Sequence, residues 1–244
     1  VSGGIGEELT GWLESFGWQL TNQPSSNYYE APRWVNIFTA THYDPVPAGA
    51  DDATAIGRLL ADQPSVFDVI VDMLGQNLPA KAEKALDVGT NVGGMAFRVA
   101  QFAGTVLGLD TAFNCVLTAR RVQTGFPKPL VSYNRYIDGH QHDCREIGPF
   151  PNNTEFMVAS ASPLPVNDSF DLITVLNVID CVPDPEVFLT SLYSSLNPGG
   201  FMLVTSPYSW GSDDVPVDRW IGGTSEQSSA AALIAFFKGL KLEI

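Results

Sequence analysis

Acidic, glycine and small polar residues between positions 87 and 94 have the spacing of a nucleotide-type pocket. Asp87 and Gly89 end a short apolar run, and Gly93 stands four residues after Gly89. Glycine allows a tight turn and leaves room for a ligand where a Cβ atom would clash. A dinucleotide fingerprint needs a second glycine where this chain has Asn91, and a phosphate-binding P-loop needs a lysine that is absent here. The spacing therefore disfavours both common phosphate cradles.

Further polar residues stand where other apolar runs end. Asp110 lies about 20 residues after Gly89, the position of a ribose-binding carboxylate, whose two oxygens can accept hydrogen bonds from a vicinal diol. Ser160 follows a third apolar run, and Asn177 and Asp180 follow a fourth. Because ligands of open α/β sheets bind beyond the carboxyl ends of the strands, we expect these residues at one edge. An acid at position 110 suits NAD as well as other nucleosides.

The elements that must position these residues alternate from Ala85 onward, which predicts a parallel, helix-covered sheet. The predicted strands cover 84–88, 105–110, 154–158, 170–176, 200–206 and 240–244, and the predicted helices cover 93–103, 112–123, 184–196 and 228–238. A polar connection over 126–153 is expected to be a loop insertion. Earlier in the chain, apolar spacing predicts helices over 7–20, around 34–38 and over 52–76. We therefore divide the chain into an N-terminal helical extension or lid, 1–80, and a ligand-binding domain, 81–244.

Composition narrows the class of protein. The chain has 244 residues, 45% of them apolar, which predicts a globular protein with a sizeable core. Its net charge of -14 disfavours nucleic acid and anionic membranes as partners and is compatible with a cationic ligand. No apolar run approaches the roughly 20 residues that span a bilayer. Three cysteines without paired spacing favour a reducing compartment, so we expect the cytoplasm, although a removed leader stays open.

One cluster invites a metal-binding interpretation. The segment 140–144 reads His-Gln-His-Asp-Cys, but its surroundings lack the paired, regular ligand spacing of zinc sites. A solvated loop is the simpler interpretation, and no metal is expected.

The order of the motifs resembles that of class I S-adenosylmethionine-dependent methyltransferases. The likeness rests on Asp-x-Gly-x-x-x-Gly at 87–93, Asp-Leu-Ile-Thr-Val at 171–175 and Leu-x-Pro-Gly-Gly at 196–200. The resemblance implies a Rossmann-like α/β fold with a mostly parallel sheet of the seven-stranded type, helices on both faces, and S-adenosylmethionine as the cofactor. It also implies a set of cofactor-binding residues: Asp87, Gly89, Thr90, Asn91, Gly93, Asp110, Ser160, Ala161 and Asn177. Ser160 stands where such enzymes commonly carry an aspartate that contacts the adenine.

Segments at both ends resemble one family more closely, the C-terminal methyltransferase domain of ovothiol synthases, which N-methylates the imidazole of a thiohistidine. The likeness lies in 205–210 (Thr-Ser-Pro-Tyr-Ser-Trp), 219–223 (Arg-Trp-Ile-Gly-Gly), 27–30 (Asn-Tyr-Tyr-Glu), 41–43 (Thr-His-Tyr) and the Asn-x-x-Asp of 177–180. The resemblance implies a small histidine-derived acceptor. It further favours a lid of Tyr28, Tyr29, His42 and Tyr43 over that acceptor, the alternative being packing for the N-terminal helices. A guanidinium and a ring at Arg219 and Trp220 suit a clamp for an amino-acid carboxylate, and a surface pair is the alternative.

The chemistry of such a reaction assigns roles to three residues. One imidazole nitrogen takes the methyl group while the other loses its proton, and Asp180 is the expected base. Asn177 is expected to hold the ring or the methionine part of the cofactor, and Tyr208 to close the pocket. Three alternatives stay open: another N- or O-acceptor, a nicotinamide-dependent oxidoreductase, which Asn91 disfavours, and a non-catalytic binding subunit, for which Ser160 is the hint. The oligomeric state is left open.

Overall fold

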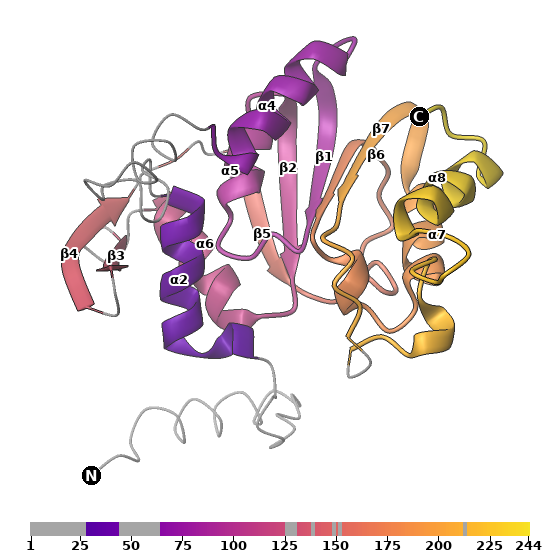
Figure 1. The fold of residues 1–244 in the computed structure, drawn as a ribbon. Coiled ribbons are helices and arrows are strands. Elements are labelled where there is room, and N and C mark those ends of the chain that lie inside the picture. Colours follow the sequence, from indigo (N-terminus) through magenta and orange to yellow (C-terminus); the bar gives the residue numbers. More distant parts are fainter. Residues whose placement is uncertain are drawn as a thin grey trace, which may run out of the picture.

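The computed structural model describes residues 28–43, 64–124, 131–137, 140–147, 150, 153–211 and 214–244. At its centre lies a parallel five-stranded sheet with the strand order β5-β2-β1-β6-β7 (Figure 1). These strands are β1 (Ala82–Val88), β2 (Ala103–Asp110), β5 (Thr154–Val158), β6 (Phe170–Leu176) and β7 (Leu196–Thr205). All five correspond to predicted strands, and the described residues supply five strands of the seven expected for this sheet type. The α/β class is confirmed.

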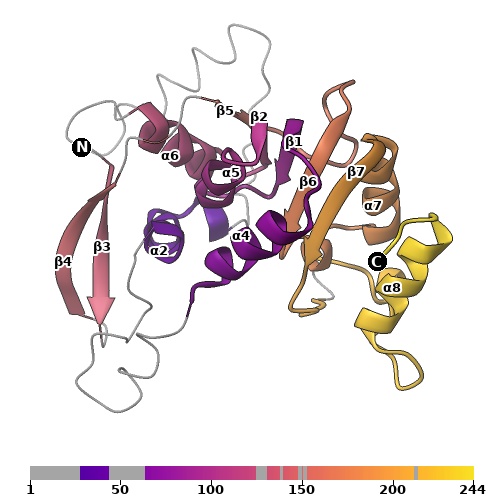
Figure 2. The same cartoon turned by 90° about the horizontal axis from the view of Figure 1, so that it is seen from above.

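Helices cover both faces of the sheet, as Figure 2 shows from above. One face carries α4 (Val66–Asn77), α5 (Gly94–Val99) and α6 (Phe113–Thr124), and the other carries α7 (Pro185–Ser194) and α8 (Ser229–Gly239). Successive residues of a strand point to opposite faces, so Ala85 joins the core under α4–α6 and Leu86 the core under α7 and α8. Burial on both faces explains why the strands read as continuous apolar runs.

The N-terminal extension is described in part. The 3-10 turn η1 (Tyr28–Glu30) leads into α2 (Pro32–Tyr43), which confirms the helix predicted around 34–38. The helix predicted over 52–76 is confirmed from Val66 on, after the N-cap Ser65, whose hydroxyl accepts a hydrogen bond from the Asp68 N–H. The helix predicted over 7–20 and the stretch 52–63 lie outside the described residues. No helix in the described part of the chain is long and apolar enough to cross a membrane.

The prediction of a loop over 126–153 is wrong. Residues in this range form two antiparallel strands, β3 (Val131–Ile137) and β4 (His140–Ile147), in a separate sheet beside α2 (Figure 1). The first strand has apolar or aromatic residues at 131, 133, 136 and 137, but polar residues interrupt their alternation and conceal the strand period. The His-Gln-His-Asp-Cys segment belongs to β4, and its side chains lie outside the described part.

The strand predicted over 240–244 is also wrong. After α8 the Leu242 N–H donates to the Phe237 carbonyl, and Lys241 has a φ of 64°. This six-residue hydrogen bond around a left-handed residue is the Schellman motif that ends helices. The backbone groups here therefore close the helix and do not form a ladder.

Candidate functional site

The site lies where the strand order reverses, between β1 and β6. The glycine turn after β1 and the loop after β6 touch there: a Cβ atom on Gly89 would lie 2.3 Å from Cγ2 of Val178. Gly89 also has a φ of 71°, which side chains rarely adopt. Ligands of open α/β sheets bind in the crevice at such a reversal. We call residues 87–94 with Asp110 the donor half of the site, and residues 177–181 with 206–209 the acceptor half.

In the donor half, Asp110 links the turns that follow β1 and β2. Its Oδ2 accepts a hydrogen bond from the Asn91 N–H at 2.8 Å, and its Oδ1 accepts one from the Ala112 N–H at 2.8 Å. Burial raises the pKa of this carboxyl above its ordinary value. A carboxylate has about four acceptor positions and backbone N–H groups occupy three at most, so Asp110 can still accept a ligand hydroxyl in the role predicted for it.

Asp87 is buried below the same turn, with 1% of its surface exposed. The Thr174 hydroxyl donates to its Oδ1 at 2.7 Å, and no ion pair with a cation is present within the described ranges. Burial raises the pKa of Asp87 to about 6. Thr90 contributes a side-chain hydrogen bond to the same carboxyl, whereas the buried Asn91 Oδ1 has no partner among the described residues. Buried polar groups are nearly always paired, so a buried carboxyl without a cation and an unpaired amide oxygen beside a glycine turn fit a polar, cationic ligand such as S-adenosylmethionine.

Asp180 is the central side chain of the acceptor half, and only 3% of it is exposed. Ser209 donates to its Oδ2 twice, from the backbone N–H at 3.0 Å and from the hydroxyl at 2.8 Å. Asp180 Oδ1 is buried and has no hydrogen-bond partner among the described residues. The loops after β6 and β7 thus hold one oxygen of the carboxylate and leave the other available.

Two further acceptor-half residues have backbone conformations that are unusual outside glycine. Asn177 has a φ of 56° and Tyr208 a φ of 53°. Asparagine tolerates this region, but for a bulky residue such as Tyr208 it is an outlier, and outliers of this kind cluster at functional sites. The Thr205 hydroxyl donates to Asn177 Oδ1 at 3.2 Å. Both predicted residues therefore lie on the loops that hold Asp180.

The predicted adenine-side residues follow β5. The Ser160 hydroxyl donates to the Ser162 carbonyl at 3.2 Å and accepts from the Ser162 N–H at 3.1 Å, while Ala161 is buried. The exposed Ser160 side chain therefore serves its own loop.

The predicted lid residues separate into two places. The Tyr29 hydroxyl contacts the Cys181 thiol, next to Asp180. The pKa of this thiol is raised, chiefly by partial desolvation. His42 Nδ1 accepts from the Gly94 N–H at 3.2 Å, and the Tyr43 hydroxyl donates to the Val92 carbonyl at 2.6 Å. Tyr29 thus reaches the acceptor half and also packs, like Tyr43, against the cluster around Val92 and Cys115, whereas the polar contacts of His42 and Tyr43 are with the glycine turn. Their binding of an acceptor stays a prediction, and the side chain of Tyr28 lies outside the described part.

Arg219 and Trp220 lie at the end of the 3-10 turn η3 (Val217–Arg219), which precedes α8. The Arg219 guanidinium pairs with Asp184 at 2.8 Å. Trp220 stacks on Trp210 with ring centroids 6.3 Å apart and donates from Nε1 to the Val215 carbonyl. The predicted carboxylate clamp remains a prediction, and its guanidinium already has an acidic partner.

Two residues of the site were not predicted from the sequence. Glu30 accepts from the Phe113 N–H at 2.6 Å and the Asn114 N–H at 2.9 Å, so its carboxylate covers the start of α6 next to Asp110. Carboxylates are favourable at helix N-termini. Ser209 is the partner of Asp180. Both lie inside segments that resemble the ovothiol-synthase family, but nothing in their spacing indicates a partner.

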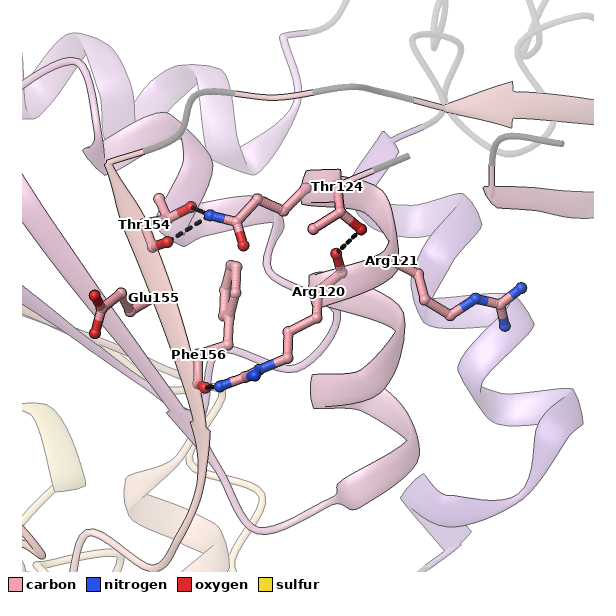
Figure 3. Close-up of a pocket in the computed structure, with 7 residues that line it drawn as sticks. Arg120, Arg121, Thr124, Thr154, Glu155 and Phe156 are labelled. Atoms are coloured by element: carbon pink, nitrogen blue, oxygen red, sulfur yellow. Dashed lines mark hydrogen bonds between the residues drawn. The ribbon is translucent and has the colours of Figure 1, made fainter. Parts of the chain in front are cut away.

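A cavity of about 380 Å³ lies elsewhere, between α6 and β5 (Figure 3). Arg120 donates to the Phe156 carbonyl and Gln123 to the Thr154 carbonyl, so side chains of α6 cover the edge of β5. Because α6 ends and β5 begins here, this cavity lies at the amino ends of the strands and is separate from the site. Within the described ranges, no three His, Cys, Asp or Glu side chains gather as metal ligands would.

The strand order, the glycine turn and the acid that ends β2 define a Rossmann-like nucleoside-binding fold. A sequence model of the methyltransferase domain matches residues 61–242, and the chain belongs to this family. It is therefore an S-adenosylmethionine-dependent methyltransferase domain. No curated protein matches the chain.

Solved structures of methyltransferases are similar in fold. An S-adenosylmethionine-dependent methyltransferase from Clostridium acetobutylicum is 15% identical, with a TM-score of 0.41 over 57% of this chain and 48% of that one. The N-methyltransferase NodS from Bradyrhizobium japonicum is 15% identical, with a TM-score of 0.42 over 62% and 67%. Magnesium protoporphyrin IX methyltransferase from Synechocystis is 17% identical, with a TM-score of 0.45 over 70% and 69%. The chain spans about half the length of the first of these proteins.

Proposed function

We propose that this domain transfers the methyl group of S-adenosylmethionine to an imidazole nitrogen of a small, histidine-derived acceptor. One observation carries the proposal. The buried Asp180 carboxylate receives two hydrogen bonds from Ser209 on Oδ2 and has a free, buried Oδ1. A free carboxylate oxygen suits an acceptor that must give up an N–H proton, because it can first orient the ring and then take that proton.

The residues divide the work between the two halves of the site. Asp87, Asp110 and the glycine turn would hold the cofactor through the buried acceptor atoms of the donor half. When bound, S-adenosylmethionine supplies a methyl group whose bond to sulfur breaks as its bond to nitrogen forms. Asp180 Oδ1 receives the proton of the second ring nitrogen. Tyr208 and Tyr29 exclude water and orient the ring. Orientation of the reacting groups supplies most of the rate enhancement of a displacement reaction.

Electrostatics supports a cationic donor at this place. Asp87, Asp110 and Asp180 are all at least partly buried, and none takes part in an ion pair among the described residues. Carboxylates that are buried without a cation are unfavourable. A sulfonium and an ammonium group would relieve this cost.

The experiment that tests the acceptor offers labelled S-adenosylmethionine with histidine, thiohistidine, an alkyl amine and a phenol. Label on the imidazole of histidine or thiohistidine is the expected result. Label that appears only on the phenol oxygen or the amine would contradict the proposal.

Asp180→Asn tests the role of the carboxylate. The amide oxygen can still accept both hydrogen bonds from Ser209, but the amide nitrogen then replaces the free oxygen and cannot take a proton. We expect kcat/KM to fall by about 10²–10⁴-fold with unchanged binding of S-adenosylhomocysteine. Asp214→Asn is the matched control, because Asp214 is an exposed acid near the same Cys181. Equal turnover of both variants would remove Asp180 as the base.

A further inference from the structure

The segment from Tyr29 to Tyr43, which we call the brace, contacts both turns that hold the donor. Both views of the ribbon place α2 beside α5 and α6, and contacts join it to each (Figures 1 and 2). The helix α2 has 12 residues and is about 18 Å long. Its two ends therefore reach two separate places in the site.

At its N-terminal end, the brace is attached to the start of α6. The Glu30 carboxylate accepts from the N–H groups of Phe113 and Asn114, and the Asn114 side chain donates to the Glu30 carbonyl at 2.8 Å. The Ala112 N–H, one residue earlier, donates to Asp110. Glu30 and Asp110 thus share the first N–H groups of one helix, and the brace is tied to the ribose-side turn.

At its C-terminal end, the brace is attached to the glycine turn. The Tyr43 hydroxyl donates to the Val92 carbonyl at 2.6 Å, and His42 Nδ1 accepts from the Gly94 N–H at 3.2 Å. The contact is close, because a Cβ atom on Gly94 would lie 2.5 Å from His42 Nδ1. The N-cap of α5 is Gly93, which has no side chain to accept these N–H groups. His42 therefore performs the capping from another helix.

Neighbouring groups keep the His42 ring and backbone in this arrangement. Arg98 donates to the Gly94 carbonyl at 2.8 Å and to the His42 carbonyl at 3.1 Å, and its guanidinium lies 4.6 Å from the centre of the Phe67 ring. The same ring packs on His42 at 4.9 Å. Burial lowers the pKa of His42 to about 3, so its Nδ1 is free to accept a hydrogen bond at neutral pH.

We propose that His42 and Tyr43 are positioning residues for the donor: the brace holds the glycine turn at a set distance from the Asp110 turn, and this arrangement binds S-adenosylmethionine. The brace bonds the main-chain groups of Val92 and Gly94. Asn91 Oδ1, in the same turn, has no hydrogen-bond partner in the described part of the chain. This role is independent of which acceptor the enzyme uses.

The test uses the full chain and S-adenosylhomocysteine, measured by titration calorimetry. His42→Leu removes the acceptor atom, whereas His42→Asn keeps an acceptor at nearly the same position in its Oδ1. Tyr43→Phe removes one hydroxyl and keeps the ring. We expect His42→Leu and Tyr43→Phe to weaken binding about tenfold, and His42→Asn to remain within about twofold of the wild type.

Thr41→Ala is the control, since Thr41 is exposed on the same helix and, within the part of the chain that the structure describes, its hydroxyl bonds only the Ile37 carbonyl. Binding by Thr41→Ala should equal that of the wild type. If His42→Asn binds as weakly as His42→Leu, the ring matters for packing alone and the positioning role is overturned. If His42→Leu does not fold, Tyr43→Phe decides, and wild-type affinity in that variant overturns the proposal. A failure to methylate histidine would contradict the proposed acceptor and leave this result unaffected.

Discussion

The donor half and the acceptor half of the site are held in different ways. In the donor half, the bonds that fix the turn run through main-chain groups, as in the N–H of Asn91 and the carbonyl of Val92. In the acceptor half, the central contact depends on one side chain, Asp180, which Ser209 from a different loop holds through both its hydroxyl and its main-chain N–H. A main-chain site depends on glycine positions and backbone angles. A side-chain site depends on a partner from a distant part of the chain, which the fold brings into contact. Single substitutions should therefore affect the two halves differently.

The largest effect is expected where the halves touch, at Gly89. In Gly89→Ala the new methyl group would lie 2.3 Å from Val178, at a φ of 71°. Left-handed strain and overpacking together should lower the free energy of unfolding by about 3 kcal/mol. We also expect binding of S-adenosylmethionine to be lost, because the loop after β6 must move. Chemical denaturation and calorimetry measure both effects.

Gly199→Ala is the matched control for this prediction. Gly199 has a φ of 79°, yet no atom of the described residues lies within 4 Å of its added Cβ atom. Only strain of about 1 kcal/mol remains, with unchanged binding. Equal decreases in the free energy of unfolding and in S-adenosylmethionine binding in the two variants would mean that the contact between the halves is unimportant.

The next prediction concerns the donor half alone and is an increase, not a decrease, in the free energy of unfolding. Burial raises the pKa of Asp87 from 3.8 to about 6. The stability associated with its proton is fully present below pH 3.8 and is lost as pH rises through 6, up to about 3 kcal/mol. At pH 8, Asp87→Asn should therefore make the ligand-free protein more stable by up to this amount. Removal of the negative charge should weaken binding of S-adenosylmethionine by about 10–100-fold.

Asp168 supplies the contrasting control. It is exposed, and a hydrogen bond from Lys84 lowers its pKa. Asp168→Asn should therefore lower stability slightly at pH 8 and leave binding unchanged. Denaturation curves between pH 4 and 8 distinguish the two carboxyls. A less stable Asp87→Asn protein with wild-type affinity would show that the buried charge does not serve the donor.

The parts of the fold that could be predicted from the sequence are those in which the local pattern reflects burial. The parallel sheet followed from apolar runs that are buried on both faces, and all five of its strands were found. The strands around 131–147 were missed because polar residues interrupt their alternation. The end of the chain was misassigned because an apolar Leu-x-Leu-x-Ile pattern at 240–244 resembles a strand, whereas its backbone closes α8 through Lys241.

Within the site, the donor half was readable because glycine spacing along the chain reflects main-chain geometry directly. Asp180 was nominated from the chemistry of its loop, but Ser209 lies 29 residues away and only the fold joins them. His42 and Tyr43 were expected at the acceptor, and their contacts with Gly94 and Val92 span 52 and 49 residues. Such long-range pairs leave no trace in local spacing.

The smallest effect concerns whether the acceptor half extends to Arg219. The Arg219 side chain is 55% exposed and pairs with Asp184, which also caps α7 by accepting from the Val187 N–H. Exposed ion pairs contribute little, so Arg219→Met should change the free energy of unfolding by less than about 0.5 kcal/mol. Because Asp184 already engages the guanidinium, we expect the KM for histidine to change less than about twofold. A much larger increase in KM, at unchanged kcat and S-adenosylhomocysteine affinity, would instead place Arg219 in the acceptor half as a clamp for the amino-acid carboxylate.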